Sequence, residues 1–294
     1  MRGKSVSRRK RRSLISRLVL YTGVIVLMLY MLGPIYVMVL SSITPDRSQL
    51  SVPPQWFPTE ISFKSYGDIL LRADLPANVA ARGFTRSLFN TFLVASGVTI
   101  LSVSLGSLAA YAYARLRMPF RDKLVFLVLF TELLPSIVVA IPLFLTVRKV
   151  GLLNNLPMLA VLECSFSLPF TIWILRGYFL SLPVELEDAA MVDGCSRVGA
   201  LFRVIYPIAT PGLFAVSAFA FLGSWNAFFL PLIFTSSEDT RTAPLAVAFL
   251  IGRFYVQFGL LAAAGTMACA IPVILALVFQ RYILRGLVAG ALKG

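Results

Sequence analysis

Six long apolar stretches, separated by polar or charged connections, dominate the pattern along the chain. A helix needs about 20 mostly apolar residues to cross a hydrocarbon core about 30 Å thick, and each stretch reaches that length. The predicted spans cover roughly residues 18–41, 87–114, 124–147, 156–179, 208–234 and 262–283. The pattern therefore predicts an all-α polytopic membrane protein with six transmembrane helices.

Composition supports this class and excludes several others. Apolar residues make up 58% of the chain and charged residues 14%, against about 25% charged residues in soluble proteins. Histidine is absent, which excludes a Ser-His-Asp triad, a histidine metal site and an imidazole pH switch. The three cysteines, Cys164, Cys195 and Cys269, form no CxxC motif and are expected to be small apolar fillers rather than disulfide or zinc ligands.

Basic residues predict the orientation, because segments rich in Lys and Arg stay on the cytoplasmic side. One set of connections, including both termini, carries 18 of them and the other set nine, so both termini are expected in the cytoplasm. Residues 1–17 form a basic tail, and 18–294 the transmembrane domain. The tail is better explained as an anchor on anionic lipid than as an arm for nucleic acid, since no soluble domain exists to carry recognition.

The connection 180–207 carries most of the distinctive chemistry. Pro183 followed by acidic residues is typical of a helix N-terminus, and Gly194 predicts the end of that short helix. Val198, Leu201, Phe202 and Ile205 then form the stripe of a second, amphipathic helix, which Pro207 is expected to break before the next span. These helices could dock into a groove on a cytoplasmic partner or lie on the membrane surface, and physical reasoning alone leaves both open.

The run from Leu182 to Gly194, continuing to Phe202, Ile205, Pro207 and Pro211, resembles the EAA loop of binding-protein-dependent ABC importer permeases. The resemblance places this loop at about residues 180–212. Further segments resemble the MalG-like, carbohydrate-serving branch of that family: Asn90–Thr91, the run 110–116, Leu134–Ser136, Ile141–Phe144, Trp225–Asn226 and the glycines near the C-terminus. The sequence departs from the family's pattern at three positions, two of them in or next to this loop and one after Met118–Pro119. Asp188 stands where a glutamate is usual, Cys195 where alanine is common and Phe120 where glycine often occurs.

The resemblance implies an inner-membrane permease subunit that performs no covalent chemistry. A second homologous permease would complete the pathway, an extracytoplasmic solute-binding protein would deliver a sugar or sugar-like solute, and an ABC ATPase dimer would bind ATP and Mg. This chain itself would bind no cofactor or metal. The residues expected to couple to the ATPases are Glu187, Asp188, Ala189, Ala190, Asp193 and Gly194. Because Asp188 is one methylene short, Glu187 is a candidate for the salt bridge to the ATPase.

Two glutamates lie within predicted spans, where an ionisable group is costly and by default suggests function. Glu132 and Glu163 are expected about 8 Å apart in depth, so they could line one solute path without touching. Such carboxylates could accept hydrogen bonds from sugar hydroxyls, with Trp225 and Asn226 nearby. Alternatively, each glutamate is protonated and bonded to a neighbouring helix.

Three further expectations concern the external loop and rival functions. The connection 235–261 is expected to dock the binding protein, as the corresponding MalG-like loop does, although it could be a plain turn back into the membrane. A secondary transporter is the main rival, but no inverted repeat or ion-coupling group is evident. A membrane enzyme is the other, and it lacks a catalytic constellation.

Overall fold

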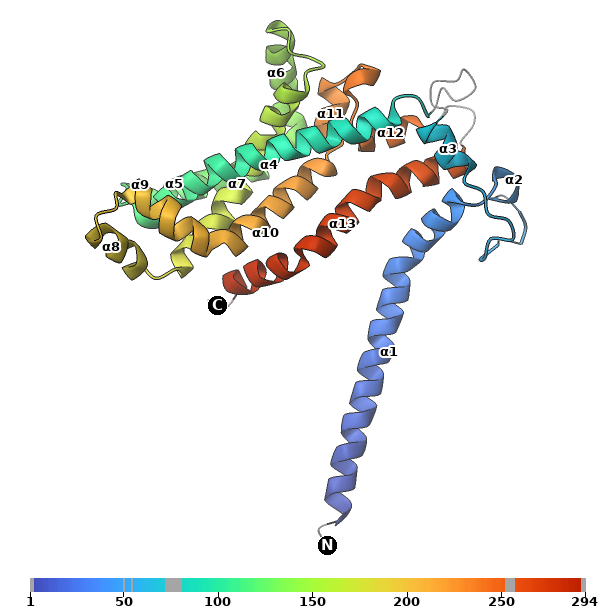
Figure 1. Cartoon of the computed structure of the whole chain (residues 1–294), viewed down its shortest axis with the longest axis horizontal. Helices are drawn as coiled ribbons and strands as arrows, with labels where there is room; N and C mark the ends of the chain where they lie inside the picture. The colour runs from blue at the N-terminus through green and yellow to red at the C-terminus, as the bar shows by residue number, and fades with distance from the viewer. Residues whose placement is uncertain (1–2, 50, 54, 72–80, 252–256, 292–294) are drawn as a thin grey trace. The chain divides into compact units, whose positions relative to one another are not determined.

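The structure is a computed structural model that describes residues 3–49, 51–53, 55–71, 81–251 and 257–291, and over these it consists mainly of helices (Figure 1). Side chains are described for residues 16–280 of these ranges, except Asp122. The chain divides into two compact units. The first comprises residues 1–72 and 251–266, and the second residues 73–250 and 267–294.

The first unit contains one long helix and two short ones. They are α1 (Gly3–Ser42), α2 (Asp46–Gln49) and α3 (Lys64–Leu70), joined by the first turns of α13 (Phe258–Ala291). The Gln49 amide donates hydrogen bonds of 2.9 Å to the carbonyls of Ser41 and Thr44. Ser42 and Tyr66 hydroxyls lie 2.8 Å apart. These contacts fold the first long connection back against the end of α1.

The second unit is built around three packed helices, α4 (Phe84–Arg115), α7 (Leu156–Ser181) and α10 (Tyr206–Trp225). A Cβ added to Gly106 of α4 would lie 2.5 Å from a Thr171 methyl of α7, and one on Gly212 of α10 would lie 2.7 Å from the Tyr178 ring. Small residues allow such close approach, which is how helices associate in lipid, where the hydrophobic effect does not drive them together.

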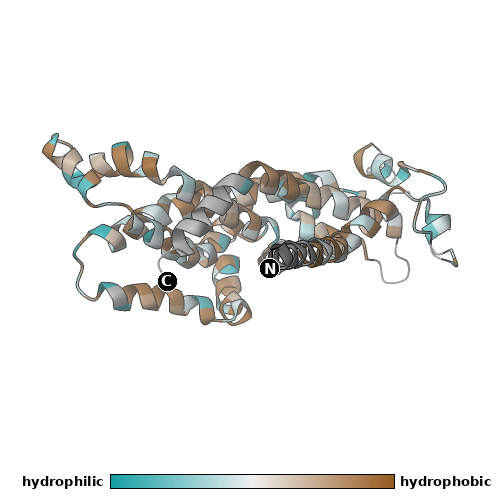
Figure 2. Cartoon of the chain, turned by 90° about the horizontal axis from the view of Figure 1, so that it is seen from below, coloured by the Kyte–Doolittle hydropathy of each residue, from teal (hydrophilic) through white to brown (hydrophobic). Residues whose placement is uncertain are grey.

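Shorter elements complete the second unit. They are α5 (Arg121–Phe130), η2 (Thr131–Leu133), α6 (Ser136–Lys149), α8 (Glu185–Val192), α9 (Arg197–Ala200), η3 (Leu201–Ile205), α11 (Phe229–Phe234), η4 (Glu238–Thr240) and α12 (Ala243–Phe249). Within this unit, α8 and α9 lie near the C-terminal end of α4, while α12 packs near its N-terminal end (Figure 1). In Figure 2 the hydrophilic residues gather mainly in connections and at helix ends.

The third predicted span is not one straight helix. Lys123–Leu133 and Ser136–Lys149 meet at an angle of 89°. Leu134, between them, has extended backbone angles and precedes Pro135, and the ring of a proline disfavours helical angles in the residue before it. Among the described residues, five helices are long and apolar enough to cross a membrane, or six if this bent pair counts as one span.

The fifth predicted span was misplaced at both ends. Its helix stops at Trp225, and α11 is a separate helix. At the other end the chain stays helical from Arg197 through Pro207, so Pro207 does not break it as expected. The stretch η3 is a π-helix, in which the Tyr206 amide donates to the Leu201 carbonyl. This wider turn lets the helix continue where a proline lacks its own amide hydrogen.

Candidate coupling loop and transport cavity

The helix α8 forms where the sequence predicted it. Glu185, Glu187 and Asp188 occupy its first turn, where negative side chains stabilise the partial positive charge of a helix N-terminus. The chain leaves the helix at Gly194, whose φ of +88° is left-handed backbone that residues with a Cβ rarely adopt. Asp188, Ala189, Asp193 and Gly194 are exposed, whereas Glu187 and Ala190 are buried.

Glu187 ties α8 to the last turns of α4. The Tyr111 hydroxyl donates a hydrogen bond to Glu187 Oε1, and Arg115 Nε lies 3.4 Å from Glu187 Oε2. The side chains of Arg115 and Glu187 are only 5% and 4% exposed. Arg115 also donates a 2.9 Å hydrogen bond to the Leu182 carbonyl, at the end of α7. The expectation that Glu187 pairs with the ATPase is therefore corrected, because its carboxylate is already paired inside this chain.

The outer surface of the α8–α9 loop combines acidic and apolar side chains. The Ser196 hydroxyl caps α9 by accepting a 3.1 Å hydrogen bond from the Gly199 amide. Val192 at the end of α8 is 87% exposed, and Val198 and Phe202 beyond it are exposed as well. The loop thus presents carboxylates and unburied apolar groups on a rigid frame, which is the composition of a docking surface.

A cavity of about 380 Å³ lies between α4, α7, α10 and the bent third span. Glu132 and Glu163 both line it, as the sequence suggested. The remaining lining residues are mostly apolar or aromatic, with two serines: Val98, Phe166, Ser167, Phe170, Phe219, Ala220, Gly223, Ser224, Ala227 and Leu230. A mostly apolar hollow with a few polar groups is the usual composition of a small-molecule site.

Glu163 is the most deeply buried polar group of this cavity, at 5% exposure. The Ser224 hydroxyl donates a hydrogen bond to Glu163 Oε2, whereas Oε1 has no hydrogen-bond partner among the described residues. Glu132 lies in η2, beside the bend of the third span, and is exposed in the single chain. The two carboxylates therefore line the cavity from different helices, and Glu163 is much more buried than Glu132.

Trp225 and Asn226 do not line this cavity. Trp225 is 2% exposed, and its indole N–H donates a 3.1 Å hydrogen bond to the Ala268 carbonyl of α13. The Asn226 amide donates to the Leu222 carbonyl of its own helix, at 2.8 Å. Their neighbour Ser224 lines the cavity instead, and sequence reasoning missed both it and the other lining serine, Ser167. Each residue turns a helix by about 100°, and an all-apolar span carries no pattern that shows which residue faces inward.

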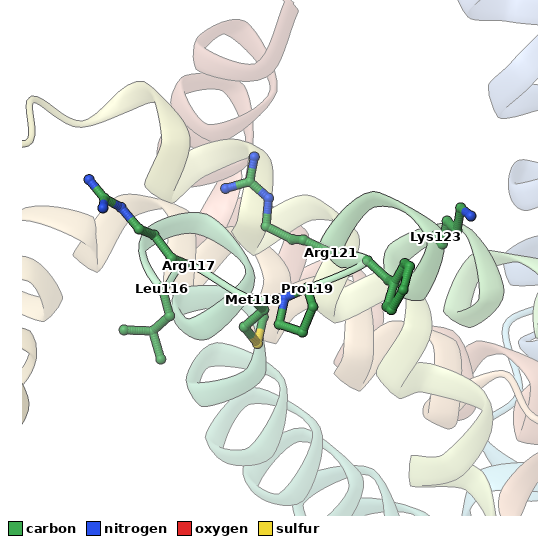
Figure 3. A pocket seen from close by; sticks show the side chains of 7 residues that line it. Leu116, Arg117, Met118, Pro119, Arg121 and Lys123 are labelled. Atoms are coloured by element: carbon green, nitrogen blue, oxygen red, sulfur yellow. The ribbon is translucent and has the colours of Figure 1, made fainter.

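A second, open hollow of about 670 Å³ lies at the connection between α4 and α5. Figure 3 shows the side chains of Arg117 and Arg121 extending from this connection. Lys123 Nζ lies 5.3 Å from the centre of the Phe120 ring. With its basic rim and no acidic lining residue among those described, this hollow fits a segment held beside anionic lipid head groups rather than a solute path.

The loop after α11 is held at the opposite end of α4. Asn154 Oδ1 accepts hydrogen bonds from the amides of Ser236 and Ser237, at 2.7 and 3.0 Å. The Asn90 side chain donates to the carbonyls of Asp239 and Arg241, at 2.8 and 2.9 Å. The first part of the connection 235–261 is thus ordered by specific bonds, while residues 252–256 lie outside the described residues.

Comparison with known proteins decides the class of this molecule. A family model described as a binding-protein-dependent transport system inner membrane component matches residues 102–289. The chain belongs to this family. It is a multi-pass membrane permease of the ABC importer type, and the family consists of transport components rather than enzymes.

Named relatives agree with the MalG-like resemblance of the permease. The trehalose/maltose transport system permease protein MalG of Thermococcus litoralis is 33% identical over 97% of this chain and 99% of its own length. The sulfoquinovosyl glycerol permease SmoH of Agrobacterium fabrum is 35% identical over 84% of both chains. The trehalose permease SugB of Mycobacterium tuberculosis is 36% identical over 81% of this chain and 84% of its own.

A solved structure shares the fold of the permease. It is a chain of a bacterial ABC transporter involved in the import of the acidic polysaccharide alginate. The two are 25% identical, with a TM-score of 0.74 that covers 92% of this chain and 98% of the other. The predicted all-α permease fold is therefore confirmed.

Proposed function

We propose that this permease carries a sugar or sugar-like solute across the cell membrane, driven by ATP hydrolysis in partner subunits. Relatives that match most of the chain are named for trehalose, maltose, diacetylchitobiose and sulfoquinovosyl glycerol, all of them saccharides or glycosides. The partners are a second homologous permease, an ABC ATPase dimer that binds ATP and Mg, and an extracytoplasmic solute-binding protein. The permease itself binds neither ATP nor metal.

The surface of the α8–α9 loop carries the coupling part of this proposal. Its exposed Asp188, Ala189, Asp193 and Gly194 would enter a groove on the ATPase, where basic residues can pair with the carboxylates. Glu187 and Ala190 would not contact the ATPase but would support the loop from inside. They are buried, so Glu187 holds α8 against α4 and Ala190 fills the interior of the loop.

The same surface argues against the alternative in which the loop lies on the membrane. The first turn of α8 has three acidic residues, and its outward residues include Glu185 and Asp188. Anionic lipid of the cytoplasmic leaflet attracts basic segments and repels acidic ones. A protein groove with positive charge therefore suits α8 better than a lipid surface does.

Two further assignments follow from the basic residues and the outer loop. With 18 Lys and Arg on one set of connections and nine on the other, both termini and the α8–α9 loop lie in the cytoplasm. The segment around η4 would then be extracytoplasmic and would receive the binding protein. Its order supports this role, because Asn154 and Asn90 fix the segment with side-chain bonds.

A bulky residue at the centre of the outer α8 surface tests the docking assignment. Ala189→Trp should weaken retention of the ATPase subunits at least about tenfold when the complex is purified through this chain, since about 1.4 kcal/mol of lost affinity suffices for that factor. Ala189→Ser, which keeps the residue small, should retain them. Both variants should insert in the membrane and elute as single species, because the spans are untouched.

The assembled wild-type complex tests the transport assignment itself. Uptake into proteoliposomes supplied with the binding protein should stop when ATP is withdrawn while an ion gradient is maintained. Uptake that persists on the gradient alone would contradict the proposal and identify a secondary transporter. Normal ATPase retention by Ala189→Trp would instead remove only the docking role of α8.

A further inference from the structure

The charges around the 380 Å³ cavity are of one sign. Glu132 and Glu163 both line it, and its described lining residues include neither lysine nor arginine. The polar groups are completed by the hydroxyls of Ser167 and Ser224. The described lining of the cavity therefore offers an occupant hydrogen-bond acceptors and hydroxyl groups, but no cationic side chain.

One carboxylate oxygen in this cavity remains available. Glu163 is 95% buried, given its 5% exposure, and its Oε2 is bound by Ser224. Its Oε1 is buried and has no hydrogen-bond partner among the described residues. Leaving a buried polar group unpaired is unfavourable, so this oxygen is suited to accept a hydrogen bond from a group that enters the cavity.

The rest of the lining can contact the apolar faces of a ring. Phe170 and Phe219 meet edge to face with ring centroids 6.1 Å apart, and Phe166 adds a third aromatic side chain to the lining. Aromatic walls with a few oriented polar groups are typical of sites for small molecules. The volume of about 380 Å³ falls in the usual range for such sites, about 300–1,000 Å³.

We infer that this cavity is a solute site within this subunit, in which Glu163 accepts hydrogen bonds and the carboxylates select solutes by charge. It admits neutral, hydroxyl-rich solutes and cationic ones such as amino sugars, and it excludes acidic sugars. The inference rests on the proposed transport of a sugar-like solute and goes further by assigning its charge class. Two similar importers are named for anionic substrates, the acidic polysaccharide alginate and a glycoside of the sulfonated sugar sulfoquinovose, so the exclusion of acidic solutes would distinguish this permease from them.

The exclusion of acidic solutes follows from burial. In a site with low effective dielectric, like charges a few ångströms apart repel far more strongly than in water. An acidic sugar would also leave its hydration shell without meeting a cation in the described lining. A hydroxyl or ammonium group instead replaces a water contact by a charge-assisted hydrogen bond.

The charge of the cavity can be measured without knowing the solute. A single cysteine is introduced by Ser167→Cys in a chain whose three natural cysteines are replaced by alanine, within the assembled complex in membrane vesicles. Its modification rate is measured with two methanethiosulfonate reagents of similar size, one carrying a trimethylammonium group and the other a sulfonate. The quantity of interest is the ratio of the cationic rate to the anionic rate.

Glu163→Gln should lower this ratio at position 167 at least about tenfold, because it removes the nearest buried negative charge. Glu132→Gln should lower it by a smaller factor and serves as a second variant if Glu163→Gln is poorly assembled. Glu185→Gln, an exposed carboxylate on α8, is the matched control and should leave the ratio unchanged. A cysteine at the exposed Val192 should show no response to Glu163→Gln, since 18 residues of α7, about 27 Å, separate Glu163 from the end of that helix.

The outcomes separate this inference from the transport proposal. An unchanged ratio in both Glu163→Gln and Glu132→Gln, or a cysteine at 167 that neither reagent modifies, would overturn the solute site. The assay uses no ATP and no solute, so neither result would bear on ATP-driven uptake. Conversely, loss of ATP dependence in the uptake assay would overturn the proposed function while the measured charge of the cavity would stand.

Discussion

Glu187 and Glu163, two buried glutamates of the second unit, differ in the groups that stabilise their carboxylates. Glu187 is 3% exposed and Glu163 is 5% exposed, so each removes an ionisable group from solvent. Glu187 has a cationic partner in Arg115 and a hydrogen-bond donor in Tyr111. Glu163 has one donor, Ser224, and its second oxygen has neither a hydrogen bond nor an ion pair among the described residues. The second oxygen of Glu187 likewise accepts no hydrogen bond, but it lies 3.4 Å from Arg115 Nε.

The difference separates a structural role for Glu187 from the binding role proposed for Glu163. A carboxylate whose two oxygens both face partners of its own chain can fix two elements together, here α8 and α4, but can offer little to another molecule. A carboxylate with one oxygen left over is poorly stabilised by its own chain and gains most from an occupant. Burial alone would have placed both residues in one category, and only the partners distinguish them.

Removal of the cation at the α8 anchor should have the largest effect on stability. Arg115→Ala removes the ion-pair partner of the buried Glu187 carboxylate, and breaking a buried pair in this way costs about 3–5 kcal/mol. The expected result is a marked fall in the thermal unfolding midpoint of the detergent-purified complex, with loss of ATPase subunits. Arg117→Ala, an exposed arginine two residues further on, is the control and should unfold like the wild type. Equal midpoints for the two variants would show that the pair anchors nothing.

The same neutral substitution at both glutamates sharpens the comparison. Glu187→Gln should destabilise the protein by about 2 kcal/mol, because it removes the charged acceptor beside Arg115. Glu163→Gln should leave stability unchanged or raise it, since a glutamine oxygen still accepts from Ser224, no cationic partner is lost and a poorly compensated buried charge is removed. Thermal midpoints measured side by side in detergent check both expectations. A larger loss at position 163 than at 187 would reverse the assignment of roles.

How far the sequence predicts this molecule depends on what each pattern encodes. Hydropathy reports length and polarity, so the long spans ending near Ser42, Arg115 and Ser181 were located within a few residues. It does not report the direction of the helix axis, so a single span was predicted where the chain bends by 89° at Leu134–Pro135, a position at which the proline indicated only that a kink was permitted. The acidic residues after Pro183 and the glycine at 194 likewise predicted α8, and the apolar stripe from Val198 to Ile205 predicted the helix that follows it.

The residues that line the candidate site were harder to predict, because helix packing decides which side chains point into the cavity. Glu132 and Glu163 were identified as candidates because a charged side chain is costly inside a membrane. That argument does not require knowing how each helix is rotated about its axis. Ser224 and Trp225 are adjacent, yet one lines the cavity and the other packs on α13. Glu187 and Asp188 are adjacent as well, yet one is buried and the other exposed. In each pair the helix rotation, fixed by contacts with distant segments, decides the role.

Filling the cavity should have the smallest effect on stability and still alter the site. A Cβ on Gly223 would meet no atom within 4 Å, although this residue lines the cavity. Gly223→Val should therefore change stability by less than about 0.5 kcal/mol, whereas it narrows the space beside Glu163. Modification of a cysteine at 167 should slow with the cationic and the anionic reagent alike, and their ratio should stay constant, because the change is one of volume rather than charge. Gly177→Val, at an exposed α7 glycine that is equally free of neighbours, should alter neither rate. If Gly223→Val shifted the ratio as strongly as Glu163→Gln, the selectivity would arise from the shape of the cavity and not from its carboxylates.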